Sequence, residues 1–115
     1  MTTPDDAEGR IQMQFLVIGR LIDAPVAPPA QEIAMLKATF EYLASGANAQ
    51  IMAVYPFADE RATALVVDVD SADDLGRLIG ALPASRLSTF VAHPIVSPQS
   101  VVDQLSQWEQ LMAGQ

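Results

Sequence analysis

The sequence predicts an α+β domain in which four strands form one antiparallel sheet and two helices cover one of its faces. Two observations support this class. The spacing of apolar residues switches between a period of two and a period near 3.6, in the order β-α-β-β-α-β. The segments between these periodic stretches carry Pro, Gly and Asp, the residues that favour turns.

The first half of the chain predicts a tail, a strand and a helix. Residues 1–11 are polar and lack periodicity, which is typical of a flexible tail. Residues 12–21 (QMQFLVIGRL) are rich in strand-forming residues, and a proline-containing loop follows them. Pro29 can open a helix over residues 30–45, and Gly46 is placed to stop it. The apolar stripe of this helix consists of Ile33, Leu36, Phe40 and Leu43.

The second half predicts a hairpin, a helix, a strand and a final helix. Residues 49–55 and 62–69 are strands joined by a short connection with Pro and Asp, which favours antiparallel pairing. Ser71 followed by Asp74 resembles a capping box that opens a helix over residues 72–82. Residues 87–96 are the fourth strand. The last helix begins at Pro98, and its apolar stripe consists of Val101, Leu105, Trp108 and Met112.

This order is the ferredoxin-like βαββαβ arrangement, with a four-stranded antiparallel sheet, two helices on one face and an extra C-terminal helix. We therefore expect a tail over residues 1–11, one domain over residues 12–96 and the C-terminal helix within residues 97–115.

Composition argues against several functions. The chain has 14 acidic and 6 basic residues among 115, so binding to the nucleic acid backbone is not expected. It has no cysteine and one histidine, and Asp73-Asp74 is typical of helix-start charge, so we expect no metal site. The acidic start does not resemble a targeting peptide, and no apolar run approaches the roughly 18 residues of a membrane span. We expect a soluble cytoplasmic protein that does not bind membranes.

The predicted strands are apolar on both faces, which indicates a partner. A sheet covered on one side alternates apolar and polar residues, whereas residues 15–18 (FLVI) are apolar in both directions. An exposed apolar sheet face favours association, and a second copy packed sheet against sheet in a closed two-fold dimer would cover it. The alternative is that the C-terminal helix, with Trp108, folds back over its own sheet.

Three segments resemble the dimeric α+β barrel proteins, in particular the muconolactone isomerase-like members: QFLVIGRLIDAP, EIAMLKATFEYLASG and ALVVDVDSADDLGRLIGALP. The resemblance covers about residues 12–96. It implies two sheets that form a barrel across a two-fold axis, often assembled into larger rings. It also implies an isomerase that moves a proton without a metal or organic cofactor. Isomerase members carry a basic and aromatic strand with a glycine turn here, whereas residues 50–57 (QIMAVYPF) have no Arg, Lys, His or Gly, so no catalytic residue is carried over.

Three residues are candidates for proton transfer, which needs one group to take the proton and another to stabilise charge. His93 is the only histidine and lies near the end of the fourth strand. Tyr55 ends the second strand and can present its hydroxyl to a pocket. Asp68 interrupts an apolar strand and either reaches solvent at a sheet edge, which we favour, or lies in a polar pocket. For His93 and Tyr55 the competing interpretation is simple packing at a strand end or an interface.

Three further residues are candidates for ligand binding. Gln14 and Gln50 flank apolar neighbours and can line a barrel interior as neutral hydrogen-bonding groups. Arg20 ends the first strand and can receive a ligand carboxylate or pair with a nearby acidic residue.

Two functions stay open. The first is a small cofactor-independent, isomerase-like enzyme that acts on a small unsaturated lactone or an aromatic catabolite. The second is a non-catalytic small-molecule-binding or oligomeric assembly module of the same fold. An open, partly polar cavity with His93 or Tyr55 at its wall favours the enzyme, whereas a cavity filled by Met52 and Phe90 favours the module.

Overall fold

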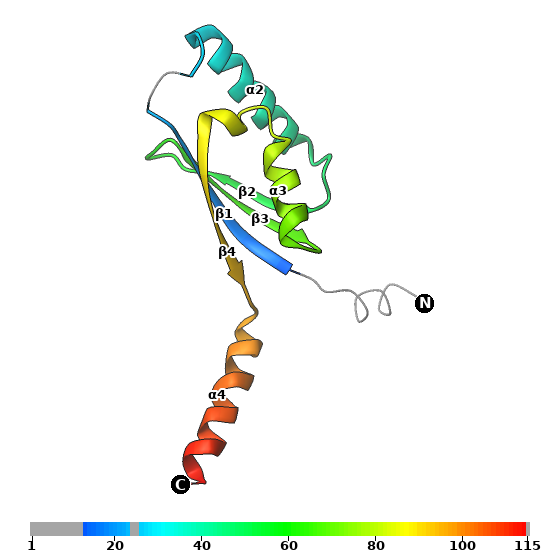
Figure 1. Cartoon of the computed structure of the whole chain (residues 1–115), viewed down its shortest axis with the longest axis vertical. Helices are drawn as coiled ribbons and strands as arrows, with labels where there is room; N and C mark the ends of the chain where they lie inside the picture. Colours follow the sequence, from blue (N-terminus) through cyan, green and yellow to red (C-terminus); the bar gives the residue numbers. More distant parts are fainter. Residues whose placement is uncertain (1–12, 24–25, 115) are drawn as a thin grey trace, which may run out of the picture.

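A computed structural model describes residues 13–23 and 26–114 (Figure 1). The predicted tail over residues 1–11 lies outside this range. The elements follow in the order β1 (Met13–Leu21), α2 (Pro29–Ser45), β2 (Ile51–Pro56), β3 (Ala62–Val69), α3 (Ala72–Gly80), a 3₁₀ turn (Ser85–Leu87), β4 (Ser88–Ile95) and α4 (Pro98–Ala113). The predicted βαββαβ order with an extra C-terminal helix is confirmed.

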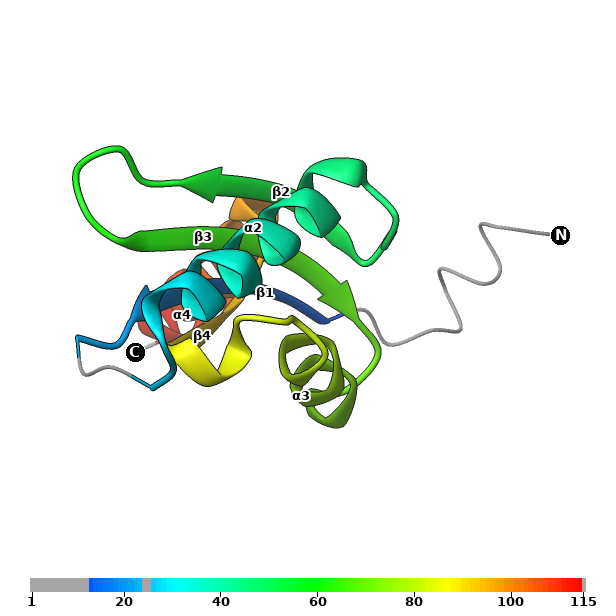
Figure 2. The ribbon, with the colours of Figure 1, turned by 90° about the horizontal axis from the view of Figure 1, so that it is seen from above.

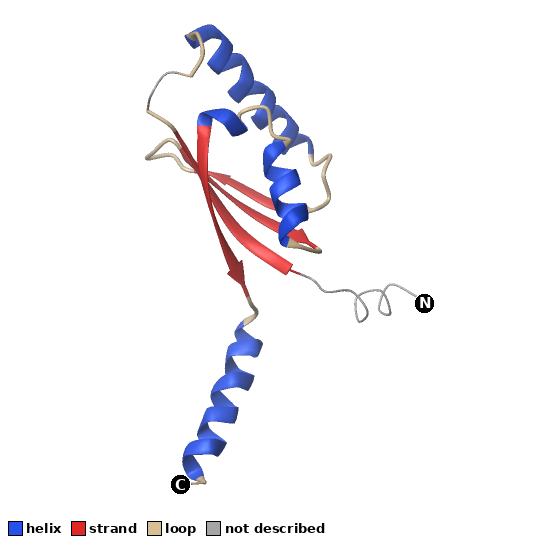
Figure 3. Ribbon diagram, in the orientation of Figure 1, coloured by secondary structure: helices blue, strands red, loops and turns tan. Residues whose placement is uncertain are grey.

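The four strands form one antiparallel sheet in the order β2-β3-β1-β4, so β2 and β4 are its edges. Helices α2 and α3 lie on the same face, and the core packs between them and the sheet (Figures 2 and 3). Val17, Val67 and Val69 are the most deeply buried side chains, and all three belong to the inner strands β1 and β3. The ferredoxin-like α+β class predicted from the sequence is therefore confirmed.

The other face of the sheet carries no helix of the described chain; we call it the open face. The register places Leu16 on β1 opposite Val66 on β3 and opposite His93 on β4, and Ile18 opposite Ala64 and Val91. Alternation along each strand assigns these residues to the open face, since their neighbours Phe15 and Val17 enter the core. The prediction that the strands are apolar on both faces is confirmed.

A bulge in β2 breaks the expected alternation of that strand. The register shifts between Ile51 and Ala53, so Met52 is the extra residue. Ile51 and Val54 pack against the core, whereas Met52 reaches the open face and lies 3.8 Å from Gln14 (Sδ to Nε2). Strict alternation along residues 51–55 would place Ile51 and Tyr55 on the same face. The bulge instead directs Ile51 to the core and leaves Tyr55 on the open face.

Two element boundaries differ from the prediction for local reasons. β2 begins at Ile51 and not at residue 49, because the Asn48 side chain accepts a hydrogen bond from the Gln50 amide (2.9 Å) and its carbonyl accepts one from the Ile51 amide (3.1 Å). α3 ends at Gly80 and not at residue 82. The 3₁₀ turn that follows takes up Leu87, which was expected to begin the last strand.

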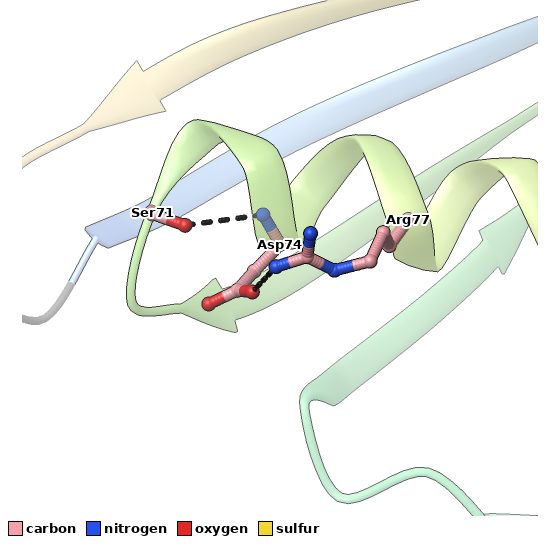
Figure 4. A network of polar contacts seen from close by, with 3 residues as sticks. All are labelled: Ser71, Asp74 and Arg77. Atoms are coloured by element: carbon pink, nitrogen blue, oxygen red, sulfur yellow. Dashed lines mark hydrogen bonds and ion pairs between the residues drawn. The ribbon is translucent and has the colours of Figure 1, made fainter.

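The helix starts and stops are encoded locally, as predicted. Pro29 is at the first turn of α2, and Gly46 ends it with a left-handed φ of 69°. Ser71 caps α3 by accepting a hydrogen bond from the Asp74 amide at 3.1 Å (Figure 4). The Asp74 carboxylate pairs with Arg77, one turn further on, so only half of the expected capping box forms.

The last helix, α4, extends away from the sheet and its two covering helices (Figure 1). None of its residues is buried. The alternative in which this helix folds back over its own sheet is therefore wrong for the single chain, and both the open face and the α4 stripe stay exposed.

Candidate functional site

A cavity of about 220 Å³ lies between α2 and one end of the sheet. It exists because α2 is set at a distance from the strands: its first turns extend past the end of the sheet, and Ile33, expected in the apolar stripe, is 65% exposed (Figure 1). The wall is mainly apolar and includes Leu36, Phe40, Leu43, Leu65, Leu82 and Phe90. The polar groups among the lining residues are Thr39, Glu60, Arg61, Thr63 and Ser88.

Thr39 links α2 to the segment that leads into β4 and closes one side of the pocket. Its side chain is 6% exposed, and its Oγ1 accepts a hydrogen bond from the Ala84 amide at 2.8 Å. The same hydroxyl donates to the Met35 carbonyl at 2.9 Å. These two bonds use the hydroxyl's donor and one of its two lone pairs, and through them Thr39 ties α2 to the chain beside the pocket.

The charged groups of the pocket come from the turn between β2 and β3. The Glu60 carboxylate pairs with the Arg20 guanidinium, and both side chains are about half exposed. Arg61 lines the pocket and also a small adjoining hollow, where Glu32 lies. Among the residues the structure describes, no carboxylate lies within ion-pair distance of Arg61.

Glu32 is fixed at the start of α2 by the loop before it. Its carboxylate accepts hydrogen bonds from the amides of Val26 (2.9 Å) and Ala27 (3.1 Å). These two bonds hold the pKa of Glu32 below its usual value, and the positive charge of Arg61 lowers it further. Glu32 is therefore an ionised carboxylate at neutral pH whose hydrogen-bonding partners are already in place.

None of the six residues predicted as site residues lines this pocket. Five of them lie on the open face: Gln14, Arg20, Tyr55, Asp68 and His93. Gln50 directly precedes β2, and its carbonyl accepts a hydrogen bond from the Asp68 amide at 2.8 Å. The pocket thus lies on the other side of the sheet from these five residues, of which Arg20 reaches the pocket-lining Glu60 at the end of the sheet.

The open face brings three of the predicted residues together at one end. Gln14 on β1 is the register partner of Asp68 on β3, and His93 on β4 is the partner of Leu16, two positions from Gln14. Gln14 therefore lies about 5–8 Å from each of the other two. Asp68 and His93 lie on the two strands that flank β1, so roughly 10 Å separates their strands and Gln14 stands between them. β3 is an inner strand and Asp68 is half-buried, so the expected exposure of Asp68 at a sheet edge is wrong.

The other two open-face candidates lie apart from this group. Arg20 is near the opposite end of β1 and pairs with Glu60, the competing interpretation considered for it. Tyr55 lies on the edge strand β2 and is 60% exposed.

Sequence reasoning missed the pocket residues, of which Arg61 and Phe90 are the clearest. Arg61 was assigned only to a turn, and Phe90 was expected to fill a cavity together with Met52, whereas it forms part of the wall of an open one. A usable signal was the order of elements: in this fold the β2–β3 turn and the start of β4 lie at the same end of the sheet as the start of α2 (Figure 2).

No protein-family model matches the chain, and no curated protein sequence matches it. Among solved structures it is similar to the Mycobacterium tuberculosis leucine response regulatory protein LrpA, with a TM-score of 0.50 and 20% sequence identity. The match covers 84% of this chain and 57% of the regulator, so the chain spans little more than half the length of that protein. A likeness of this size supports the ferredoxin-like fold.

In the part of the chain that the structure describes, no helix is both long and apolar enough to cross a membrane. Within the same residues, no three His, Cys, Asp or Glu side chains gather in a way that could hold a metal ion.

Proposed function

We propose that the chain is a small-molecule-binding module whose pocket takes a compact apolar molecule with one anionic group, such as a carboxylate. The observation that carries this proposal is the pocket beneath α2, with its apolar wall and Arg61. Binding sites for small molecules are typically apolar clefts with a few placed polar groups.

The size and chemistry of the wall define the body of the ligand. A cavity of roughly 150 Å³ lined by Leu, Ile and Phe holds benzene. At about 220 Å³, this pocket has room for one ring or a branched aliphatic chain with a short substituent. The rings of Phe40 and Phe90 supply flat apolar surface for such a group.

Arg61 defines the charged end of the ligand. The neighbouring Glu60 is neutralised by Arg20, so Arg61 is the cation of the pocket without an ion-pair partner among the described residues. A guanidinium binds a carboxylate through two parallel hydrogen bonds, which are stronger than bonds between neutral groups. The preference for an anion is therefore local, although the chain as a whole has a net charge of −8.

The structural neighbour agrees with this class of function. That protein is named a leucine response regulatory protein, and leucine has a branched aliphatic chain and a carboxylate. The likeness in fold does not depend on the pocket, so the two lines of support are independent.

Self-association belongs to the same proposal. The open face carries apolar side chains on all four strands, including Met52, Leu16, Val66 and Val91. We propose that a second copy covers it in a closed two-fold dimer, with further assembly of dimers into rings as the dimeric barrel resemblance implies.

A second candidate is the isomerase-like activity, favoured by the grouping of Gln14, Asp68 and His93 on the open face. In a single copy His93 is exposed, whereas a second copy packed over the open face would enclose the group and allow proton transfer to a small lactone. His93→Ala would abolish such turnover, and unchanged turnover would remove His93 from the mechanism.

The binding proposal is tested with matched anionic and neutral probes. Benzoate, phenylacetate and leucine are titrated into the full chain beside benzamide and phenylacetamide, and binding is followed by calorimetry and NMR. We expect the carboxylates to bind more tightly and Arg61→Gln to weaken them about tenfold or more while sparing the amides. Arg77→Gln, on the exposed surface of α3, is the control and should change nothing. Equal binding of acids and amides would contradict the role of Arg61, and no binding of any probe would contradict the pocket.

A further inference from the structure

The helix α4 has a complete apolar stripe with nothing packed on it. Val101, Leu105, Trp108 and Met112 repeat at three- and four-residue spacing and are between 42% and 70% exposed. The opposite side of the helix is polar, with Gln99, Asp103, Ser106 and Gln110. Such a stripe is the feature by which a helix packs against another apolar surface.

A helix of this length does not gain its stability from its backbone alone. Even alanine-rich isolated helices are marginal in water below about 12–15 residues, and in proteins most helical stability comes from packing of the apolar face. α4 has 16 residues, a Ser97 cap and no buried side chain. We therefore expect it to persist because another surface covers its stripe.

The open face is a second uncovered apolar surface on the same chain. Its middle is formed by Leu16, Ile18, Ala64, Val66 and Val91, none of which is charged. The ionisable residues of the face lie toward its ends: Arg20 is at one end, and Asp68 and His93 are toward the other, where His93 is the cross-strand partner of Leu16. The chain has 20 Asp, Glu, Lys and Arg residues, yet none of them belongs to the α4 stripe or to the middle of the open face. These two uncharged apolar surfaces are therefore suited to pack on each other.

The junction between β4 and α4 keeps these two surfaces apart within one chain. Only Val96 and Ser97 connect the strand to the helix. Pro98 biases Ser97 to an extended backbone, observed at φ −75° and ψ 153°, and the Ser97 hydroxyl accepts a hydrogen bond from the Ser100 amide at 3.1 Å. This cap directs α4 away from its own sheet (Figure 1).

We propose that α4 is an exchanged arm: its stripe packs on the open face of a second copy, whose α4 packs on the first in return. A two-fold pair covers both arms and both faces at once, and the two contacts are equivalent by symmetry. This inference rests on the self-association proposed above and deepens it by naming the surfaces that meet: the partner's α4, and not the partner's sheet, covers each open face. It does not depend on the pocket.

The native chain provides a direct readout, because Trp108 is its only tryptophan. In a separate copy the Trp108 side chain is 53% exposed. With dilution, we expect the tryptophan emission to shift to longer wavelength over the same concentration range in which sedimentation shows dimers dissociating. A chain that stays monomeric at high concentration, or dimers whose tryptophan stays exposed, would overturn the exchange.

Matched charge substitutions locate the contact. Leu105→Asp places a charge in the stripe, Val91→Asp places one in the open face, and Gln110→Asp places the same charge on the polar side of α4. We expect either of the first two to raise the dimer dissociation constant about a hundredfold, and Gln110→Asp to leave it nearly unchanged. Circular dichroism confirms that each variant is folded. Equal effects of Leu105→Asp and Gln110→Asp would contradict the packing of the stripe.

Introduced cysteines can distinguish packing of α4 on a second copy from packing of α4 on its own chain or on another α4. The chain has no cysteine of its own that would interfere. Leu105→Cys and Val91→Cys chains are mixed and oxidised, and a mixed disulfide dimer supports the exchange. A disulfide between two Leu105→Cys chains in the absence of the mixed one would show arm-to-arm pairing. A monomeric disulfide in the double variant would show packing on the same chain. Either result would overturn the proposal, and binding of benzoate by the same chains tests the pocket separately.

Discussion

Phe90 packs over Gly19, its cross-strand partner on β1, so closely that the glycine has no room for a side chain. A Cβ placed on Gly19 would lie 2.8 Å from Cε1 and 3.1 Å from Cδ1 of the Phe90 ring. Both residues line the pocket. The absent side chain of Gly19 thus sets the position of one aromatic wall of the site.

Gly19→Ala should reduce the pocket. The backbone at Gly19 does not have a positive φ, so its conformation is one that alanine can adopt. The new Cβ would, however, displace the Phe90 ring. We expect a loss of stability of about 1–3 kcal/mol from crowding and a weaker affinity for carboxylate probes, measured by urea unfolding and calorimetry. The control is Gly76→Ala in α3, where a Cβ meets nothing within 4 Å. It should raise stability by up to about 1 kcal/mol and leave binding unchanged. Unchanged binding in Gly19→Ala would show that ligands do not occupy the space beside Phe90.

Thr39→Val should destabilise the protein through the Ala84 amide. In the native protein the Ala84 amide donates to Thr39 Oγ1 at 2.8 Å. Valine matches threonine in shape but has no hydroxyl, so this buried N–H would lose its acceptor. The expected cost is about 1–3 kcal/mol in the free energy of unfolding, measured by urea denaturation. Thr39→Ser keeps the hydroxyl and should lose less. If the valine variant is as stable as the serine variant, the bond does not contribute as the geometry indicates.

The fold could be predicted from the sequence because each element carries its own signal. Periodicity switches between strands and helices, and Pro29, Gly46 and Ser71 mark helix ends through chemistry that acts over a few residues. The start of β2 and its bulge could not be predicted in this way. They depend on the Asn48 turn and on pairing with β3, which is settled only when the sheet forms.

The site was harder to predict because it depends on a distance between elements. Sequence patterns showed that Leu36 and Leu43 face the sheet, but they did not show that α2 leaves a cavity beneath it. His93 was a candidate because of the chemistry of its side chain, but the strand register places it on the open face, away from the pocket. Arg61, which lines the pocket without an ion-pair partner among the described residues, lies in a segment that the sequence predicts only as a turn between two strands.

Ser71→Ala should destabilise α3 by removing its N-cap. The Ser71 hydroxyl accepts the Asp74 amide at 3.1 Å (Figure 4), and loss of such a cap costs about 1 kcal/mol. The neighbouring ion pair between Asp74 and Arg77 is exposed on the arginine side and should contribute little, so Arg77→Ala should change stability by less than about 0.5 kcal/mol. Thermal unfolding of both variants makes the comparison. A larger effect for Arg77→Ala would reverse this ranking of cap and ion pair.

Glu32→Gln should lower the free energy of unfolding by an amount that depends on pH. The amides of Val26 and Ala27, and then the charge of Arg61, lower the folded-state pKa of Glu32 below its ordinary value of 4.5. A depressed carboxylate pKa contributes stability that is fully present above the unfolded pKa and is lost as pH falls through the folded one. Urea unfolding at a series of pH values should therefore show the largest deficit of the variant near pH 7 and a shrinking deficit below about 4.5. Glu41→Gln, on the exposed side of the same helix, is the control. A deficit that stays constant with pH would mean that glutamine disturbs the loop by its shape, and that the ionised carboxylate is not what holds it.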